Sequence, residues 1–211
     1  MSVPYPELTL EDFVSRLGSD APTPGGGSVA ALTLALSAAL GRMVVMLSVG
    51  RPRFAEHEDG LVLRRERLRE AAQDALAAIA ADEAAFVPLT LAWKLPADSP
   101  ERAAAVEAGL VSAAMAPLAL LTSCRKLLDE LAWLPGRTSR LAVSDIACAA
   151  ELAGAAAAMA RVNVLVNTRL MTDRETAEKM NLEAEAALSA CRESAARLSS
   201  GIAAELAKPR G

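Results

Sequence analysis

Asp82 is the side chain of this sequence whose type and setting best fit proton transfer. It lies in an alanine-rich stretch that should be largely buried, and desolvation raises the pKa of a buried carboxyl group towards a useful range. A solvated acid on a helix surface is the alternative, because Glu83 follows directly. Asp82 is therefore a candidate proton-transfer residue whose role the local pattern alone leaves open.

Two amides form a second candidate group. Asn163 and Asn167 are four residues apart, so they share one helix face, and valines and a leucine surround them. Amides in such surroundings need hydrogen-bond partners if they are buried. A polar ligand would supply those partners, and so would an interhelical hydrogen bond in the core. The spacing favours neither.

A glycine block precedes the first long apolar segment, in the stretch APTPGGGSVAAL over residues 21–32. Glycines let the backbone approach a ligand closely, and a helix N-terminus offers free amides to an anion or an electron-rich ring. Neither nucleotide signature is present, because no Gly-Lys-Ser/Thr and no GxGxxG occurs here. On composition alone, a flexible entry into a packed helix is the favoured interpretation.

The elements that must position these residues are helices. Alanine and leucine dominate, the chain is 53% hydrophobic but 3% aromatic, and no segment alternates as a strand does. We predict an all-α bundle of long antiparallel helices with a short N-terminal helix, forming a single domain over residues 1–211. The predicted helices cover 10–17, 28–49, 53–93 with a kink or interruption at Pro88, 100–134 with a kink at Pro117, 144–171, and 174–207 after a capping box at 172–175.

Composition excludes several classes of function. A net charge of −4 and a pI near 5.2 argue against nucleic-acid binding, and one histidine with three scattered cysteines argues against a metal site. The apolar run 28–49 is long enough to cross a membrane, but Arg42 inside it favours a central bundle helix. The cluster of arginines with a glutamate at 64–69 is interpreted as a solvated helix face. The N-terminus has no signal-peptide pattern, so a cytoplasmic protein is expected.

The order of several motifs resembles the formiminotransferase-cyclodeaminase family over about residues 8–190. The most distinctive is PTPGGGSVAAL at 22–32, running into MVVMLSVG at 43–50. The weaker motifs that follow in the expected order are Asp82 with Ala85-Phe86, Leu95-Pro96 with Arg102, Ala116-Pro117, Ser144-Asp145, Asn163-Val164 with Asn167, and Asp173.

The resemblance implies a metal-free enzyme acting on a tetrahydrofolate derivative. The reaction would be cyclisation of 5-formiminotetrahydrofolate with release of ammonia, or hydrolysis of 5,10-methenyltetrahydrofolate. Asp82 would move protons, and the pterin would supply partners for the two asparagines. The glutamate tail, which can be polyglutamylated, would bind the arginines. The implied substrate-binding residues are Pro24, Gly25, Gly26, Gly27, Ser28, Arg51, Arg53, Lys94, Asp145, Asn163 and Asn167. A homodimer and a separate formiminotransferase are the implied partners.

The sequence also departs from the family pattern. Arg51-Pro-Arg53-Phe54 stands where the family has a Lys-Lys-Tyr-like triplet, and Ala97 replaces a lysine, with Lys94 just before it. These departures motivate an alternative, a non-catalytic helical protein that binds folate or serves in assembly. Asp145 lies 18 positions before Asn163, about 27 Å along a straight helix, so it is a helix cap, a distant ligand contact, or a contributor to a neighbouring subunit's site.

Overall fold

The computed structural model describes residues 5–21 and 23–208, so Pro22 of the glycine motif lies outside the described residues. The described part is helical and contains no strand. Its elements are η1 (Tyr5–Glu7), α1 (Leu10–Leu17), α2 (Gly26–Met46), η2 (Pro52–His57), α3 (Glu58–Ala92), α4 (Pro100–Ala132), η3 (Arg140–Ala142), α5 (Val143–Thr168) and α6 (Arg174–Leu206). The predicted all-α class is confirmed.

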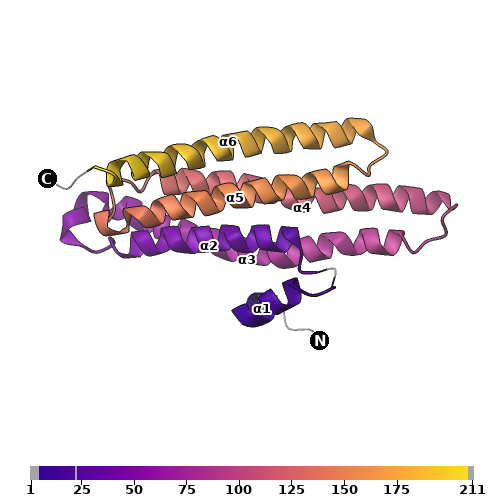
Figure 1. Cartoon of the computed structure of the whole chain (residues 1–211), viewed down its shortest axis with the longest axis horizontal. Helices are drawn as coiled ribbons and strands as arrows, with labels where there is room; N and C mark the ends of the chain where they lie inside the picture. Colours follow the sequence, from indigo (N-terminus) through magenta and orange to yellow (C-terminus); the bar gives the residue numbers. More distant parts are fainter. Residues whose placement is uncertain (1–4, 22, 209–211) are drawn as a thin grey trace.

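The long helices run antiparallel, and each packs on the next (Figure 1). α2, α3, α4 and α5 close a four-helix bundle, and α6 covers α4 and α5. The short helix α1 lies outside the bundle (Figure 1), while η1 packs against α3. In this arrangement α2 and α5 are direct neighbours, and Ser37 Oγ donates to the Ala149 carbonyl across them at 2.6 Å.

Alanines explain how α5 can contact three long helices at once. Its buried positions are mostly alanine, and a side chain of one methyl group lets neighbouring backbones approach closely. The buried alanines of α5 are Ala149, Ala150, Ala153, Ala156, Ala157 and Ala160. Larger side chains from the other helices, such as Leu34, Leu121 and Leu128, fill the space around them.

Helix starts follow local capping chemistry. Thr9 caps α1 and Ser99 caps α4, as the sequence predicts, each accepting a hydrogen bond from a backbone amide of the first turn. The predicted capping box at 172–175 is wrong, because Asp173 caps α6. Thr172 instead donates its hydroxyl proton to Glu107 Oε2 of α4 at 2.7 Å.

The two internal prolines lie inside continuous helices, so Pro88 kinks its helix at most and does not interrupt it. α3 continues through Pro88 and α4 through Pro117. Proline cannot donate to the carbonyl four residues earlier, so Pro117 leaves the carbonyl of Ala113 free. Asn167 of α5 donates Nδ2 to that carbonyl at 3.2 Å. A neighbouring helix thus satisfies the group that the proline leaves unpaired.

Four helical segments are apolar and long enough to cross a membrane, judged by length and composition alone. They are Gly26–Met46, Pro52–Ala92, Pro100–Ala132 and Arg140–Thr168, and the bundle buries from 22% to 50% of their most apolar windows. The apolar character predicted for 28–49 is therefore shared by other long helices of the bundle. Much apolar surface stays uncovered in a single chain.

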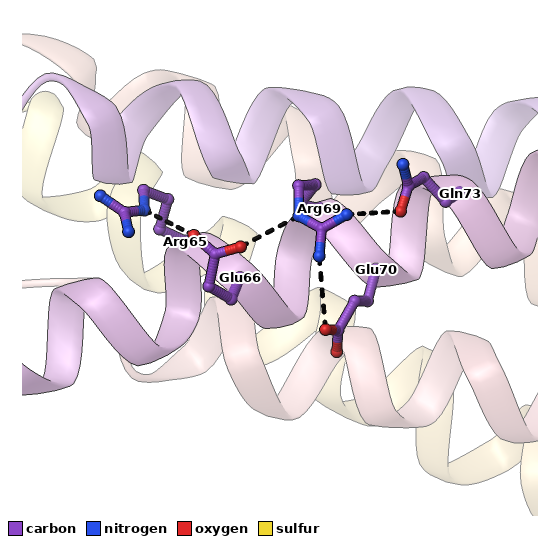
Figure 2. Close-up of polar contacts among 5 residues, drawn as sticks. All are labelled: Arg65, Glu66, Arg69, Glu70 and Gln73. Atoms are coloured by element: carbon purple, nitrogen blue, oxygen red, sulfur yellow. Dashed lines mark hydrogen bonds and ion pairs between the residues drawn. The ribbon is translucent and has the colours of Figure 1, made fainter.

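The charged cluster at 64–69 is only partly the solvated face that the sequence predicts. Figure 2 shows Glu66 between two arginines of α3: Arg65 Nε donates to Glu66 Oε1 at 2.8 Å, and Arg69 Nε donates to Oε2 at 3.0 Å. These side chains are exposed or half-buried. Arg64 is different, because its guanidinium stacks 3.8 Å from the centroid of the Trp133 ring and thus serves packing between α3 and the end of α4.

A substitution at Gly109 tests the close approach of α3 and α4. A methyl group there would lie 3.0 Å from Leu89 Cα and 3.2 Å from its backbone nitrogen, which are atoms that cannot rotate away. Gly109→Ala should lower the free energy of unfolding by about 1–3 kcal/mol in urea denaturation. The control is Gly201→Ala in α6, where nothing lies within 4 Å and stability should rise by about 0.5–1 kcal/mol. Equal stability of the two variants would contradict this packing.

Candidate active site

The glycine block forms the start of α2. Gly25 is the N-cap, and Val29 makes the first intrahelical bond by donating its amide to the Gly25 carbonyl at 3.0 Å. The sequence prediction placed this start at Ser28, so the helix begins two residues earlier and contains two glycines in its first turn. The amides of Gly26, Gly27 and Ser28 precede the first helical bond and can donate to a ligand.

Asp82 of α3 lies directly against this first turn. A methyl group built on Gly27 would overlap the Asp82 carboxylate, so this contact needs a residue without a side chain. The fully buried Ser28 Oγ has no hydrogen-bond partner of good geometry among the described residues. A carboxylate, a buried hydroxyl and free amides therefore gather where α2 begins.

The setting of Asp82 shifts its acidity in the direction that general acid–base chemistry needs. Burial raises the pKa of this carboxyl group above its ordinary value, the neighbouring Ser28 hydroxyl opposes the rise, and the negative charge of Glu83 adds to it. Half-buried, Asp82 is not the solvated surface acid of the alternative interpretation. A raised pKa lets it both accept and return a proton nearer to neutral pH.

Both asparagines reach the same end of the bundle. Asn163 faces the glycine turn, since a methyl group on Gly26 would lie 3.4 Å from its Nδ2, and this Nδ2 donates to the Met159 carbonyl at 2.8 Å. Asn167 makes the interhelical bond to Ala113 described above. One amide thus faces the candidate site, while the other joins α5 to α4.

A cavity of about 340 Å³ opens beside Asp82 and Gly27. Alanines make up more than half of its lining, and its polar side chains are Asp74, Asp82 and Ser123, so we call this cavity the alanine slot. Its lining residues are Gly27, Ala31, Asp74, Ala75, Ala77, Ala78, Ala81, Asp82, Ala116, Pro117, Ala119, Leu120, Ser123 and Ala160. A mostly apolar cavity with a few polar side chains is typical of small-molecule sites.

The segment before α2 is held to the site by residues that the sequence analysis did not single out. Tyr5 donates its hydroxyl proton to Thr23 Oγ1 at 3.0 Å, and Thr23 Oγ1 donates to Glu83 Oε1 at 3.3 Å. Pro24 follows and is buried. Hydrogen bonds to η1 and α3 thus hold the segment that leads into the glycine turn. No local sequence signal predicts these contacts.

The remaining candidate residues are not at this site within one chain. Arg51 and Arg53 follow the other end of α2, about 30 Å from Gly26 at 1.5 Å per residue. Asp145 lies in the first turn of α5, whose N-cap is Ala142, so it does not cap the helix. Lys94 follows the end of α3, about 18 Å beyond Asp82 along the helix axis, and is exposed.

Two further features bear on metal or thiol chemistry. Within residues 5–21 and 23–208, no group of three or more His, Cys, Asp or Glu side chains is placed to hold a metal ion. Cys124 and Cys191 are buried, and burial raises the pKa of both thiols. Cys148 is exposed on α5, far from the glycine turn along that helix.

Fold and candidate site together define a helical-bundle protein in which a half-buried carboxylate meets a glycine-rich helix start beside a cavity. The chain belongs to the formiminotransferase-cyclodeaminase family, whose model matches residues 9–186. It is 34% identical over 184 residues to a methenyltetrahydrofolate cyclohydrolase from Methylorubrum extorquens, covering 85% of this chain and 88% of that protein.

Two other comparisons concern a longer relative and a solved structure of similar length. The formimidoyltransferase-cyclodeaminase of Sus scrofa is 40% identical over 172 residues, which cover 78% of this chain but 31% of that protein, so the chain spans about a third of the length of such relatives. The crystal structure of formiminotetrahydrofolate cyclodeaminase from Thermotoga maritima has a TM-score of 0.81 and 25% identity, covering 94% of this chain and 98% of that one.

Proposed function

We propose that the protein is a folate-dependent one-carbon enzyme. Its reaction is either the cyclisation of 5-formiminotetrahydrofolate with release of ammonia or the hydrolysis of 5,10-methenyltetrahydrofolate to the 10-formyl form. The observation that carries this proposal is the contact of Asp82 with the glycine turn at the mouth of the alanine slot. The relatives named for these two activities support it.

Both reactions use the same proton transfers at one carbon atom. In cyclisation, N10 attacks the formimino carbon and loses its proton, and the departing amine gains a proton as its bond to carbon breaks. In hydrolysis, water adds to the carbon of the methenyl cation and loses a proton, and N5 gains a proton as the carbon–N5 bond breaks. The hydroxyl group of the adduct gives up its own proton to solvent as the formyl C=O bond forms, so one proton is released overall. Asp82 accepts the first proton and returns the second, while the slot holds the pterin rings and the turn amides bind polar atoms.

The proposal extends to partners and compartment. The substrate is a tetrahydrofolate, which can carry a polyglutamate tail. The working unit is a homodimer that acts in the cytoplasm and not in a membrane. The uncovered apolar surface of the bundle supports the dimer. If the reaction is cyclisation, we propose that a separate formiminotransferase supplies the formimino substrate.

A direct assay tests this function. The purified protein is given 5,10-methenyltetrahydrofolate or 5-formiminotetrahydrofolate, and loss or gain of the near-ultraviolet absorbance of the methenyl form is followed, with ammonia measured in parallel. We expect one of the two conversions to run faster than in buffer. If neither is accelerated while the folate still binds, the non-catalytic folate-binding alternative replaces the proposal.

A further inference from the structure

The N-terminal segment, which lies outside the four-helix bundle (Figure 1), is attached to the candidate site by two aromatic side chains. Phe13 is the buried residue of α1, and its ring packs edge-on against the ring of Tyr5, with 6.2 Å between the centroids. Tyr5 lies in η1, which packs against α3. Apolar packing thus brings the hydroxyl group of Tyr5 to the segment that leads into the glycine turn.

Tyr5, Thr23 and Glu83 form a hydrogen-bond chain with a fixed direction. An ionised carboxylate can only accept hydrogen bonds, so Thr23 donates its single hydroxyl proton to Glu83 Oε1, at 3.3 Å. The oxygen of Thr23 accepts the hydroxyl proton of Tyr5, at 3.0 Å. All three side chains are partly buried, and a hydroxyl group that accepts one hydrogen bond donates the next more strongly. Tyr5 therefore strengthens the bond between Thr23 and Glu83.

This hydrogen-bond chain joins the same two segments that form the candidate site. Thr23 lies two residues before Gly25, the N-cap of α2, and Glu83 directly follows Asp82 on α3. The contact between Gly27 and Asp82 leaves no room for a methyl group, so a small change in the spacing of the two segments moves the Asp82 carboxylate. The bond from Thr23 to Glu83 limits that change.

Glu83 also acts on Asp82 through its charge. Burial is the main cause of the raised pKa of the Asp82 carboxyl group, and the negative charge of Glu83 adds to it. The described residues that line the cavity from α2, α4 and α5 are uncharged, and Asp74 of α3 lines it two turns away. From η1 come the Tyr5 hydroxyl group and the exposed Glu7. The charge of Glu83 is therefore the one to remove in order to change the acidity of Asp82.

We propose that Tyr5, Thr23 and Glu83 are positioning residues, which hold the glycine turn against Asp82 and keep a second carboxylate beside it. They act through Asp82 and the turn, and they do not touch the reacting atoms. The N-terminal segment is then part of the working site, although it lies outside the bundle. This inference rests on the proposed function, because the step that it supports is the proton transfer assigned to Asp82.

Two substitutions that separate the hydrogen bonds from the charge test this role. Tyr5→Phe keeps the ring against Phe13 but removes the hydroxyl group, and it should lower kcat by a factor of about three to ten without moving the pH profile. Glu83→Gln keeps an oxygen that accepts from Thr23 but removes the charge, so Asp82 holds a proton less tightly. The acid limb of kcat/KM, which reports the ionisation of Asp82, should therefore move to lower pH.

The measurement is the initial rate of the folate conversion that the wild type accelerates, taken across pH with the rate in buffer subtracted, and thermal unfolding checks that each variant is folded. Glu70→Gln is the matched control for charge. It removes the same charge from the same helix, about 18 Å from Asp82 along the axis, and should leave the pH profile unchanged. Thr23→Val is the control for the hydrogen bonds, because Tyr5→Phe should have no further effect in a protein that already lacks the Thr23 hydroxyl group.

Three results would overturn the positioning role. They are an unchanged kcat in Tyr5→Phe, additive effects of Tyr5→Phe and Thr23→Val, and a wild-type acid limb in Glu83→Gln. Failure of the proposed function is distinguishable from these, because the wild type itself would then convert neither folate, and this inference would fall with it.

Discussion

Asp82→Asn is expected to lower turnover by a factor of about 100 to 10,000, the usual contribution of a positioned acid or base. The amide has nearly the same shape as the carboxyl group, so the glycine turn and the alanine slot keep their form, but it cannot accept and return a proton. The measurement is kcat from the absorbance of methenyltetrahydrofolate, with folate binding measured separately by calorimetry. Binding should persist while turnover is lost.

Asp74→Asn is the matched control for this substitution. Asp74 lines the same cavity from the same helix but is exposed, two helical turns before Asp82. Its replacement should change kcat little. A folded Asp82→Asn protein that keeps the wild-type rate would show that another group moves the protons.

Asp82→Asn should also change how the free energy of unfolding depends on pH. Burial raises the pKa of Asp82 in the folded state above the ordinary 3.8, so the folded state holds this proton more tightly than the unfolded state does. Wild-type stability therefore falls as pH rises from about 3.8 to the raised value. Asp82→Asn removes this loss and should be more stable than the wild type at neutral pH, with the difference vanishing below the ordinary pKa.

Gly27→Ala is the second substitution with a large expected effect. The added methyl group would occupy the place of the Asp82 carboxylate and force it to rotate. A side-chain rotation costs little stability, but a reacting group displaced by about 1 Å can cost roughly 100-fold in rate. We expect a folded protein with kcat/KM reduced by about that factor, measured together with thermal unfolding.

Gly26→Ala separates this effect from a general intolerance of the turn. Its methyl group would lie 3.4 Å from Asn163 Nδ2, at ordinary contact distance, so activity should stay close to wild type. If both variants lose activity equally, then the free amides or the flexibility of the turn matter rather than the room left for Asp82.

The amino-acid sequence alone determined the helical class, most helix limits and the family. These features depend on local causes. Alanine and leucine favour helix, hydroxyl side chains at Thr9 and Ser99 cap helix starts, and the ordered motifs of the family survive in one chain. Local rules count the hydrogen bond that Pro117 removes, but they could not show that Asn167 of another helix donates to the Ala113 carbonyl instead.

Only the tertiary structure decided which candidate residues meet. The sequence could not distinguish Gly26 from Gly27, since the difference lies in what approaches each from another helix: Asn163 at contact distance and the Asp82 carboxylate with no room for a methyl group. It also could not show that Arg51 and Arg53 lie at the far end of α2. Residue spacing reports positions along one helix, whereas a site depends on the distances between helices, which the packing of alanine faces sets.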